Sequence, residues 1–109
     1  MSEKGLKEDG EGKQMWHPMP LVLLEPLANA FVAGTKKYKI FSCLGEFENP
    51  DATFYDAMVR HLNQCQLNPL AIDKEIYNKY GIVVYHSAQI AFNSLMRIYH
   101  CKKEREKKS

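Results

Sequence analysis

Long apolar runs are missing from this sequence, and their absence argues against a membrane protein. No purely apolar run exceeds four residues, as in Leu21–Leu24, whereas a helix that spans a bilayer needs about 20. The first residues are polar and carry no signal-peptide pattern. These absences predict a soluble, cytoplasmic protein that has no membrane partner.

Paired cysteines and the common catalytic signatures are missing as well. The three cysteines, Cys43, Cys65 and Cys101, are widely spaced and form no Cys-x-x-Cys pair. This argues against a disulfide framework and against structural zinc. The sequence also contains no Gly-rich phosphate loop, and no Ser/His/Asp or Cys/His set stands at positions that indicate covalent catalysis.

A basic face with interleaved aromatic residues is also absent, although the net charge is +2. The tail, residues 102–109, holds five Lys or Arg against two Glu, so the rest of the chain carries about −1. Basic residues at the end of a helix complement the helix dipole. Nucleic acid is therefore not an expected partner.

The length of 109 residues allows a single domain. Residues 1–14 contain three glycines and seven charged residues, so we expect them to be disordered. Residues 15–101 form the expected folded domain, and residues 102–109 form a charged, solvated helix end. A domain of this size has a thin core, and such domains often complete it by association. We therefore expect a homo-oligomer, a dimer or larger.

Apolar residues at helical spacing predict an all-α fold, a small bundle of about four helices. The expected helices cover residues 21–33, 52–66, 72–79 and 81–100. Pro26 is tolerated only in a first turn, which places the start of the first helix near Glu25. Gly34 is expected to end that helix. Residues 35–38 then form a turn or a short second helical piece, and residues 39–51 form a loop. Residues 82–85 are read as helical because the pattern continues past them.

A polar stripe runs along the last expected helix, which is otherwise rich in apolar residues. Its members recur at intervals of three, four, four and three and are His86, Gln89, Asn93, Arg97 and His100. At about 100° per residue they share one face of a helix. Polar groups among apolar neighbours predict a half-buried seam whose donors and acceptors meet another helix or a ligand.

Three stretches together resemble one family. They are residues 20–38, which close on Gly34-Thr-Lys-Lys-Tyr38, then Tyr55-Asp-Ala-Met-Val-Arg-His-Leu62, and His86-Ser-Ala-Gln-Ile-Ala-Phe-Asn93. In order and approximate spacing they are similar to the all-α nucleoside triphosphate pyrophosphohydrolases related to MazG. Within these, they resemble the phage-associated dATP/dGTP diphosphohydrolase domain. The resemblance covers residues 20–100 and implies a phage protein.

The resemblance implies a nucleotide ligand and hydrolysis of a triphosphate to a monophosphate and pyrophosphate, with Mg²⁺ or Mn²⁺ as cofactor. Asp73 and Glu75 would be catalytic, and Glu25 would join them as metal ligands. Hard cations need several oxygen ligands, mainly carboxylates. The residues implied in nucleotide binding are Lys36, Lys37, Tyr38, Arg60, His61, His86, Gln89 and Asn93.

The sequence also departs from the family pattern. Leu67-Asn-Pro-Leu70 stands where the family carries Gly-Glu, Gln89 replaces a second histidine, and the stretch from Glu75 to His86 is about six residues longer. These departures favour an alternative in which a catalytically degenerate member binds and sequesters a nucleotide or a cyclic-nucleotide signal.

Each implied residue also has a structural interpretation. His86, Gln89 and Asn93 could bond across a bundle or a dimer seam, and Lys36 and Lys37 could complement a helix end. In that interpretation Arg60 lies on the surface beside a core His61, Asp73 and Glu75 face solvent, and Tyr38 only packs. A third hypothesis is therefore a structural protein that oligomerises through its helices.

Overall fold

The computed structural model of the chain describes residues 18–39 and 41–108, including the side chains of 18–39 and 41–107. Its elements are the 3₁₀ turns η1 (Leu21–Leu24) and η2 (Ser42–Leu44) and the helices α2 (Glu25–Lys37), α3 (Pro50–Cys65), α4 (Lys74–Tyr80) and α5 (His86–Lys108). The predicted all-α fold is confirmed, because these residues include no strand beyond one isolated bridge. Residues 1–14, predicted to be disordered, lie outside the described residues.

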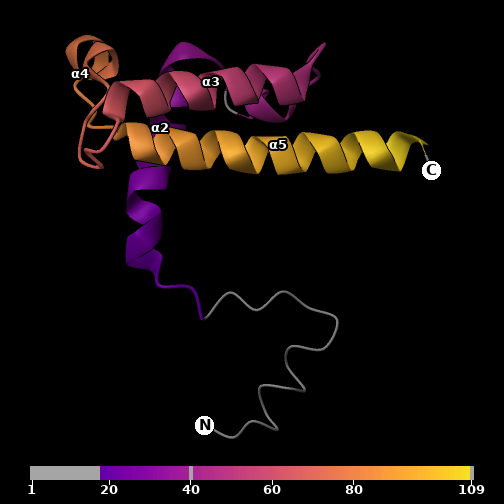
Figure 1. Cartoon of the computed structure of the whole chain (residues 1–109), viewed down its shortest axis with the longest axis horizontal. Helices are drawn as coiled ribbons and strands as arrows, with labels where there is room; N and C mark the ends of the chain where they lie inside the picture. Colours follow the sequence, from indigo (N-terminus) through magenta and orange to yellow (C-terminus); the bar gives the residue numbers. More distant parts are fainter. Residues whose placement is uncertain (1–17, 40, 109) are drawn as a thin grey trace, which may run out of the picture.

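Helices α3 and α5 lie side by side and run in opposite directions (Figure 1). The start of α3 meets the middle of α5 through Asp51 and Arg97, and the end of α3 meets the start of α5 through His61 and His86. Helix α4 lies at this second end, and α2 projects away from it (Figure 1). Three elements therefore converge where α5 begins.

Helix α2 begins at Glu25, as Pro26 in its first turn predicted, but it does not end at Gly34. It continues to Lys37, where the N–H of Tyr38 donates to the carbonyl of Gly34 at 2.9 Å. The prediction was wrong because glycine lowers helix propensity by only about 1 kcal/mol and does not remove a hydrogen bond. The extra turn carries Lys36 and Lys37 on the helix itself.

The prediction that residues 82–85 are helical was also wrong. Gly81 adopts φ +70° and ends α4, and the chain then runs extended to α5, which begins at His86. Val84, fully buried, accepts a hydrogen bond from the N–H of Asp73 at 2.8 Å. The β-branched Ile82, Val83 and Val84 favour this extended form.

The polar stripe of α5 is buried inside the chain. His86, Gln89, Asn93 and His100 are only 5–8% exposed. The stripe faces α3 and η2, and the imidazole Nε2–H of His100 donates to the carbonyl of Cys43 at 2.8 Å. The expected half-buried seam is thus confirmed as a seam within the bundle, so these four residues are not exposed to form a dimer seam.

A row of aromatic rings connects α2 and the loop of residues 45–49 to the seam between α3 and α5. Phe31 of α2 contacts Phe92 of α5 edge to face, with ring centroids 4.9 Å apart. Phe92 meets Phe54 of α3, and Phe54 stacks on His100 and contacts Phe47. Such ring pairs contribute about 0.5–1.5 kcal/mol beyond the area they bury. This row accounts for how α2 and the 45–49 loop are held to α3 and α5.

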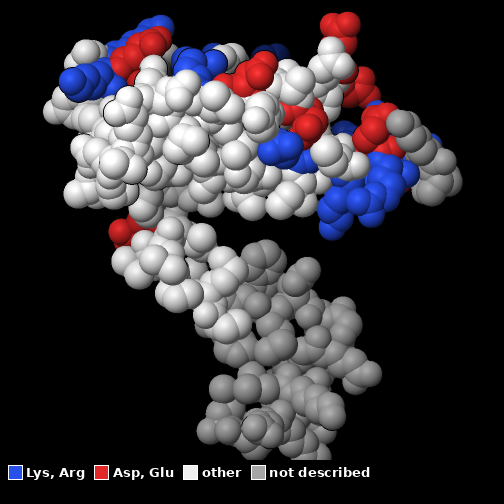
Figure 2. Space-filling view, viewed as in Figure 1, with Lys and Arg blue, Asp and Glu red and all other residues white. Residues whose placement is uncertain are grey.

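The core is small, as the length predicted. Its buried members are few and mostly of moderate size: Ala33, Phe54, Cys65, Ile76, Val84, Ala88 and Met96. Three apolar residues of η1 are 66–73% exposed, namely Leu21, Val22 and Leu23. They lie on the arm formed by η1 and α2, which projects away from α5 (Figure 1). Figure 2 shows few charged residues on this arm or on the adjoining part of α5. Association into a homo-oligomer stays a prediction.

Within residues 18–39 and 41–108, none of the helices combines the length and apolar character needed to span a lipid bilayer. Even α5, which has 23 residues, carries the polar stripe and a charged end.

Candidate functional site

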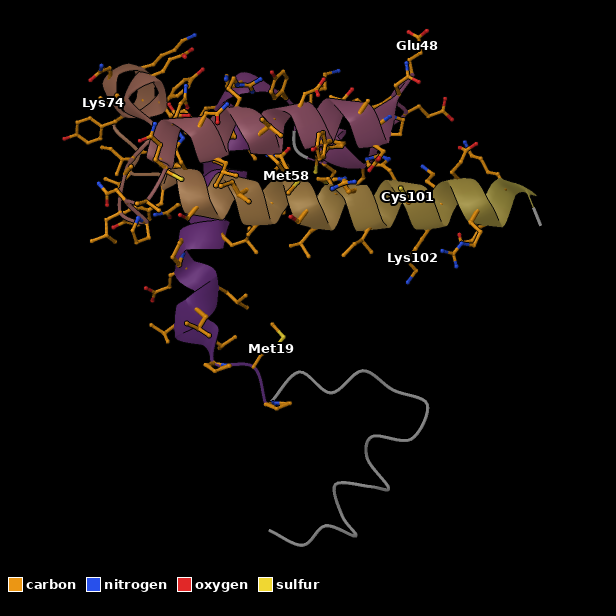
Figure 3. The ribbon with its side chains drawn as sticks, in the orientation of Figure 1. Met19, Glu48, Met58, Lys74, Cys101 and Lys102 are labelled. Atoms are coloured by element: carbon orange, nitrogen blue, oxygen red, sulfur yellow. The ribbon has the colours of Figure 1, made fainter. Side chains whose placement is uncertain are left out.

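The end of the bundle where α5 begins holds a group of three side chains that can ligate a metal. They are His61 from the last turns of α3, Asp73 just before α4, and His86 at the start of α5. One ligand atom from each lies within 4.8 Å of the other two. In Figure 3 this end of the bundle is the one where Lys74, the residue after Asp73, is labelled. Met58, labelled in the same figure, lies farther along the seam, between α3 and α5.

Two short backbone segments position Asp73 and His86. Ile72 and Tyr85 form an antiparallel bridge. On either side of it, the N–H of Asp73 donates to Val84 and the N–H of His86 donates to Ala71, at 2.8 and 3.0 Å. Asp73 is also the N-cap of α4, since its Oδ1 accepts the N–H of Ile76 at 3.1 Å. The site therefore depends on the extended segment 82–85.

A relay of hydrogen bonds connects these side chains through Gln89. The Nε2–H of Gln89 donates to Asp73 Oδ2 at 2.8 Å. This leaves Gln89 Oε1 facing His86 Nδ1 at 3.1 Å. Because an amide oxygen only accepts, His86 carries its proton on Nδ1. The same Nδ1 lies 3.0 Å from His61 Nδ1, which is therefore unprotonated and accepts the hydrogen of His86.

His61 is held neutral. The pKa of His61 is lowered from 6.5 to about 4, mainly by burial, with smaller lowering effects from His86, Arg60 and Lys37 that Asp73 partly offsets. A neutral imidazole with an unprotonated nitrogen is the form that binds metals. The contribution of Arg60 and Lys37 shows that two cations act electrostatically on this site.

Asp73 stays ionised despite partial burial. Burial alone raises the pKa of its carboxyl, but the hydrogen bonds from Gln89 and from the N–H of Ile76, with the two histidines, outweigh it. The net pKa lies below the ordinary value of 3.8. The site thus presents one carboxylate and one unprotonated imidazole nitrogen, His61 Nδ1, at neutral pH.

The lowered pKa of His61 predicts how the stability of the metal-free protein depends on pH. Between pH 6.5 and about 4 the unfolded chain takes up a proton at His61 that the folded chain does not. The free energy of unfolding should therefore fall as the pH decreases through this window. Urea unfolding in the presence of a chelator measures it. His61→Gln should show a shallower decline, and an equal decline in both proteins would contradict the assignment.

The structure brings together only part of the predicted site. Asp73, His61, His86 and Gln89 form one network, and Arg60 and Lys37 lie near enough to affect it. Of the three carboxylates predicted as metal ligands, only Asp73 belongs to the group of three, while Glu25 and Glu75 are exposed and belong to no such group among the described residues.

The other predicted nucleotide-binding residues lie outside this network or at its edge. Lys36 and Tyr38 are exposed at the end of α2. Asn93 lies one turn beyond Gln89, is 5% exposed, and donates its Nδ2–H to the carbonyl of Gln89 at 2.7 Å. Asn93 thus supports the helix backbone beneath the site.

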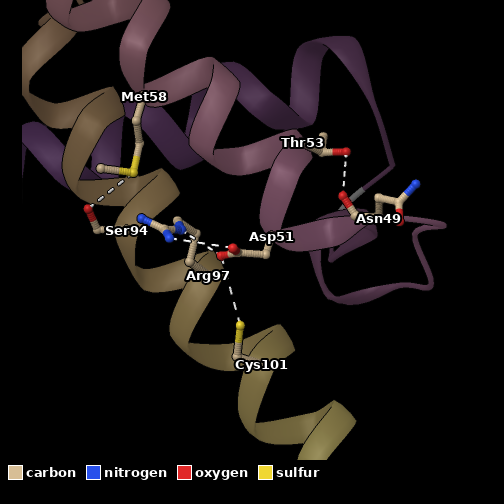
Figure 4. A network of polar contacts seen from close by, with 7 residues as sticks. All are labelled: Asn49, Asp51, Thr53, Met58, Ser94, Arg97 and Cys101. Carbon is tan, nitrogen blue, oxygen red and sulfur yellow. Dashed lines mark hydrogen bonds and ion pairs between the residues drawn. The ribbon is translucent and has the colours of Figure 1, made fainter.

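The far half of the stripe meets helix α3, as one of the two interpretations of the stripe predicted. Arg97 Nε donates to Asp51 Oδ1 at 2.6 Å, and Cys101 lies 3.8 Å from the same oxygen (Figure 4). Ser94 donates to the sulfur of Met58 between these contacts and the candidate site. The Asp51–Arg97 pair is partly exposed, so solvent screens much of its electrostatic attraction.

No protein-family model, curated protein or solved structure matches this chain.

Proposed function

We propose that this chain binds a nucleoside phosphate at the site formed by His61, Asp73 and His86. In its active form it would hydrolyse a triphosphate or deoxytriphosphate to the monophosphate and pyrophosphate. One observation carries the proposal: potential metal ligands lie together in one group, and two cations, Lys37 and Arg60, act on that group. Metal and cations together suit a phosphate chain, whose charge must be neutralised.

The residues of the site would have separate roles in metal binding, phosphate binding and the orientation of Asp73. The group of three would hold a divalent ion, which polarises a phosphoryl oxygen and lowers the pKa of bound water. Arg60 suits a phosphate because its guanidinium donates two parallel hydrogen bonds, and Lys37 would add a point charge. Gln89 would orient Asp73, because its amide already donates to that carboxylate.

A second function is favoured by a specific observation. The carboxylates Glu25 and Glu75 do not join Asp73, so the acidic, multi-carboxylate site implied by the family resemblance is not assembled from them. A protein that binds a nucleotide or cyclic nucleotide without cleaving it needs the cations and the polar seam but not that acidic site. In this alternative, binding would persist without a divalent metal.

The test is incubation of the purified chain with a mixed pool of NTPs and dNTPs, with Mg²⁺, Mn²⁺, Zn²⁺ or Co²⁺ supplied separately, followed by ion-exchange chromatography. We expect one nucleotide to yield its monophosphate and pyrophosphate. Replacing Lys37 and Arg60 by alanine should lower kcat/KM roughly 10- to 100-fold for each lost contact, since a hydrogen bond to a charged group contributes about 1.5–3 kcal/mol.

The matched control is Lys102→Ala with Lys103→Ala, which removes the same charge from the distant end of α5. Turnover in this control should stay within twofold. An unchanged pool combined with metal-independent nucleotide binding would favour sequestration. An unchanged pool without binding of any nucleotide, including cyclic ones, would refute both functions.

A further inference from the structure

We propose that His61, Asp73 and His86 form a site for a borderline transition ion of the Zn²⁺ and Co²⁺ class, not for Mg²⁺. The inference goes beyond the proposed function, because the ion would bind with no nucleotide present. It differs from the family-implied set of carboxylates, and from structural zinc, since none of its ligands is a cysteine.

The donor atoms set the ion class. Two imidazole nitrogens and one carboxylate are ligands that suit zinc, cobalt and iron, whereas Mg²⁺ prefers oxygen ligands in an octahedron and keeps several waters. Three protein ligands also leave a fourth position open for water or a phosphate oxygen, as in catalytic zinc sites.

The two histidine nitrogens lie close to the spacing that a zinc ion needs, and the ligand atom of Asp73 lies within 4.8 Å of both histidine ligand atoms. Ligands on a tetrahedral zinc ion at about 2.0–2.2 Å are roughly 3.3–3.5 Å apart. His61 Nδ1 and His86 Nδ1 are 3.0 Å apart, joined by the shared proton of His86. Moving that proton to His86 Nε2 frees both Nδ1 lone pairs, so a small separation of the rings would admit an ion between them.

Both polar atoms of the Gln89 side chain would contribute to the ion site. Its Nε2–H already orients the Asp73 carboxylate, and hydrogen bonds of this kind position metal ligands in known sites. Its Oε1 lies 3.1 Å from His86 Nδ1 and loses its donor when the proton moves, so it then faces the ion or a bound water.

The scaffold holds the ligands before any ion arrives. Asp73 and His86 are fixed by the two backbone hydrogen bonds beside the Ile72–Tyr85 bridge, and Asp73 also caps α4. His61 is fixed to α3, which packs along α5. Ligands on fixed elements bind an ion with a smaller entropic cost than ligands on separate loops.

The test is calorimetric titration of the chelator-treated full chain with Zn²⁺ alone and with Mg²⁺ alone, and a Co²⁺ titration read by visible absorption. We expect one Zn²⁺ per chain, bound at least about 100-fold more tightly than Mg²⁺. The Co²⁺ spectrum should indicate nitrogen and oxygen ligation. Because no nucleotide is added, failure of the proposed function leaves this result unaffected.

His61→Gln and, separately, Asp73→Asn should each weaken Zn²⁺ binding by at least about tenfold, and their helical circular dichroism shows whether they fold. His100→Gln changes a buried histidine of the same seam, and Glu75→Gln removes a charge two residues from Asp73; both should bind Zn²⁺ like the parent chain. Three results would overturn the proposal. They are the absence of saturable Zn²⁺ binding, an equal loss of Zn²⁺ binding in the His100→Gln control, and a sulfur-to-cobalt charge-transfer band in the Co²⁺ spectrum.

Discussion

Replacing Asp73 by alanine is expected to lower the free energy of unfolding by about 2–4 kcal/mol and to abolish nucleotide turnover. The carboxylate makes two contacts that alanine cannot make, because it caps α4 through the N–H of Ile76 and accepts the amide of Gln89. Loss of an N-cap costs about 1 kcal/mol, and a buried donor left without a partner costs about 1–3 kcal/mol. Urea unfolding and nucleotide assays on the same preparation measure both effects.

Glu75→Ala is the matched control, two residues farther along the chain. Glu75 is exposed and belongs to no group of potential metal ligands among the described residues, so its removal should change stability by less than about 0.5 kcal/mol. The family resemblance implies that both Asp73 and Glu75 are catalytic, whereas only Asp73 belongs to the candidate site in the structure. Loss of turnover in Glu75→Ala with full activity in Asp73→Ala would contradict the site described above.

Replacing Phe54 by alanine is expected to lower the free energy of unfolding by about 3–5 kcal/mol, the range for a buried phenylalanine. Phe54 is 6% exposed, and its ring stacks on His100 with centroids 5.4 Å apart and meets Phe47 at 5.2 Å. Its removal leaves a cavity where α3, α5 and the 45–49 loop meet. Thermal and urea unfolding followed by circular dichroism measure the loss.

Tyr55→Ala provides the comparison for Phe54→Ala, since it removes an aromatic ring from the next position of α3. Tyr55 is 50% exposed, and Arg97 lies over its ring at 5.1 Å. Such an exposed cation–π contact contributes about 0.5–1 kcal/mol, so the loss of stability should not exceed about 1 kcal/mol. Equal losses in the two variants would show that the aromatic row does not hold the bundle together.

Periodicity in the sequence was sufficient to predict the helices and the buried face of α5. The stripe from His86 to His100 lies along one face of a single helix, so its spacing depends only on local geometry. The start of α2 follows from Pro26 for the same reason, because a proline constrains the residues next to it. These features are local, and residues within a few positions of one another determine them.

The extended conformation of residues 82–85 could not be predicted from local sequence. Its residues Ile82, Val83 and Val84 continue an apolar pattern that fits a buried helix or a buried strand equally well. Pairing with residues 71–73, through the hydrogen bonds of Asp73 and His86, decided between them. No residue within the segment itself indicates that partner.

The sequence by itself therefore determined the all-α class, most helix positions and the identity of the polar side chains that face the seam. Only the tertiary structure decided that His61, Asp73 and His86 share one site and that Glu25 and Glu75 do not. The physical reason is the length scale of the interactions. Helix periodicity and capping act over one or two turns, whereas the site joins the end of α3, the cap of α4 and the start of α5 through contacts that only packing creates.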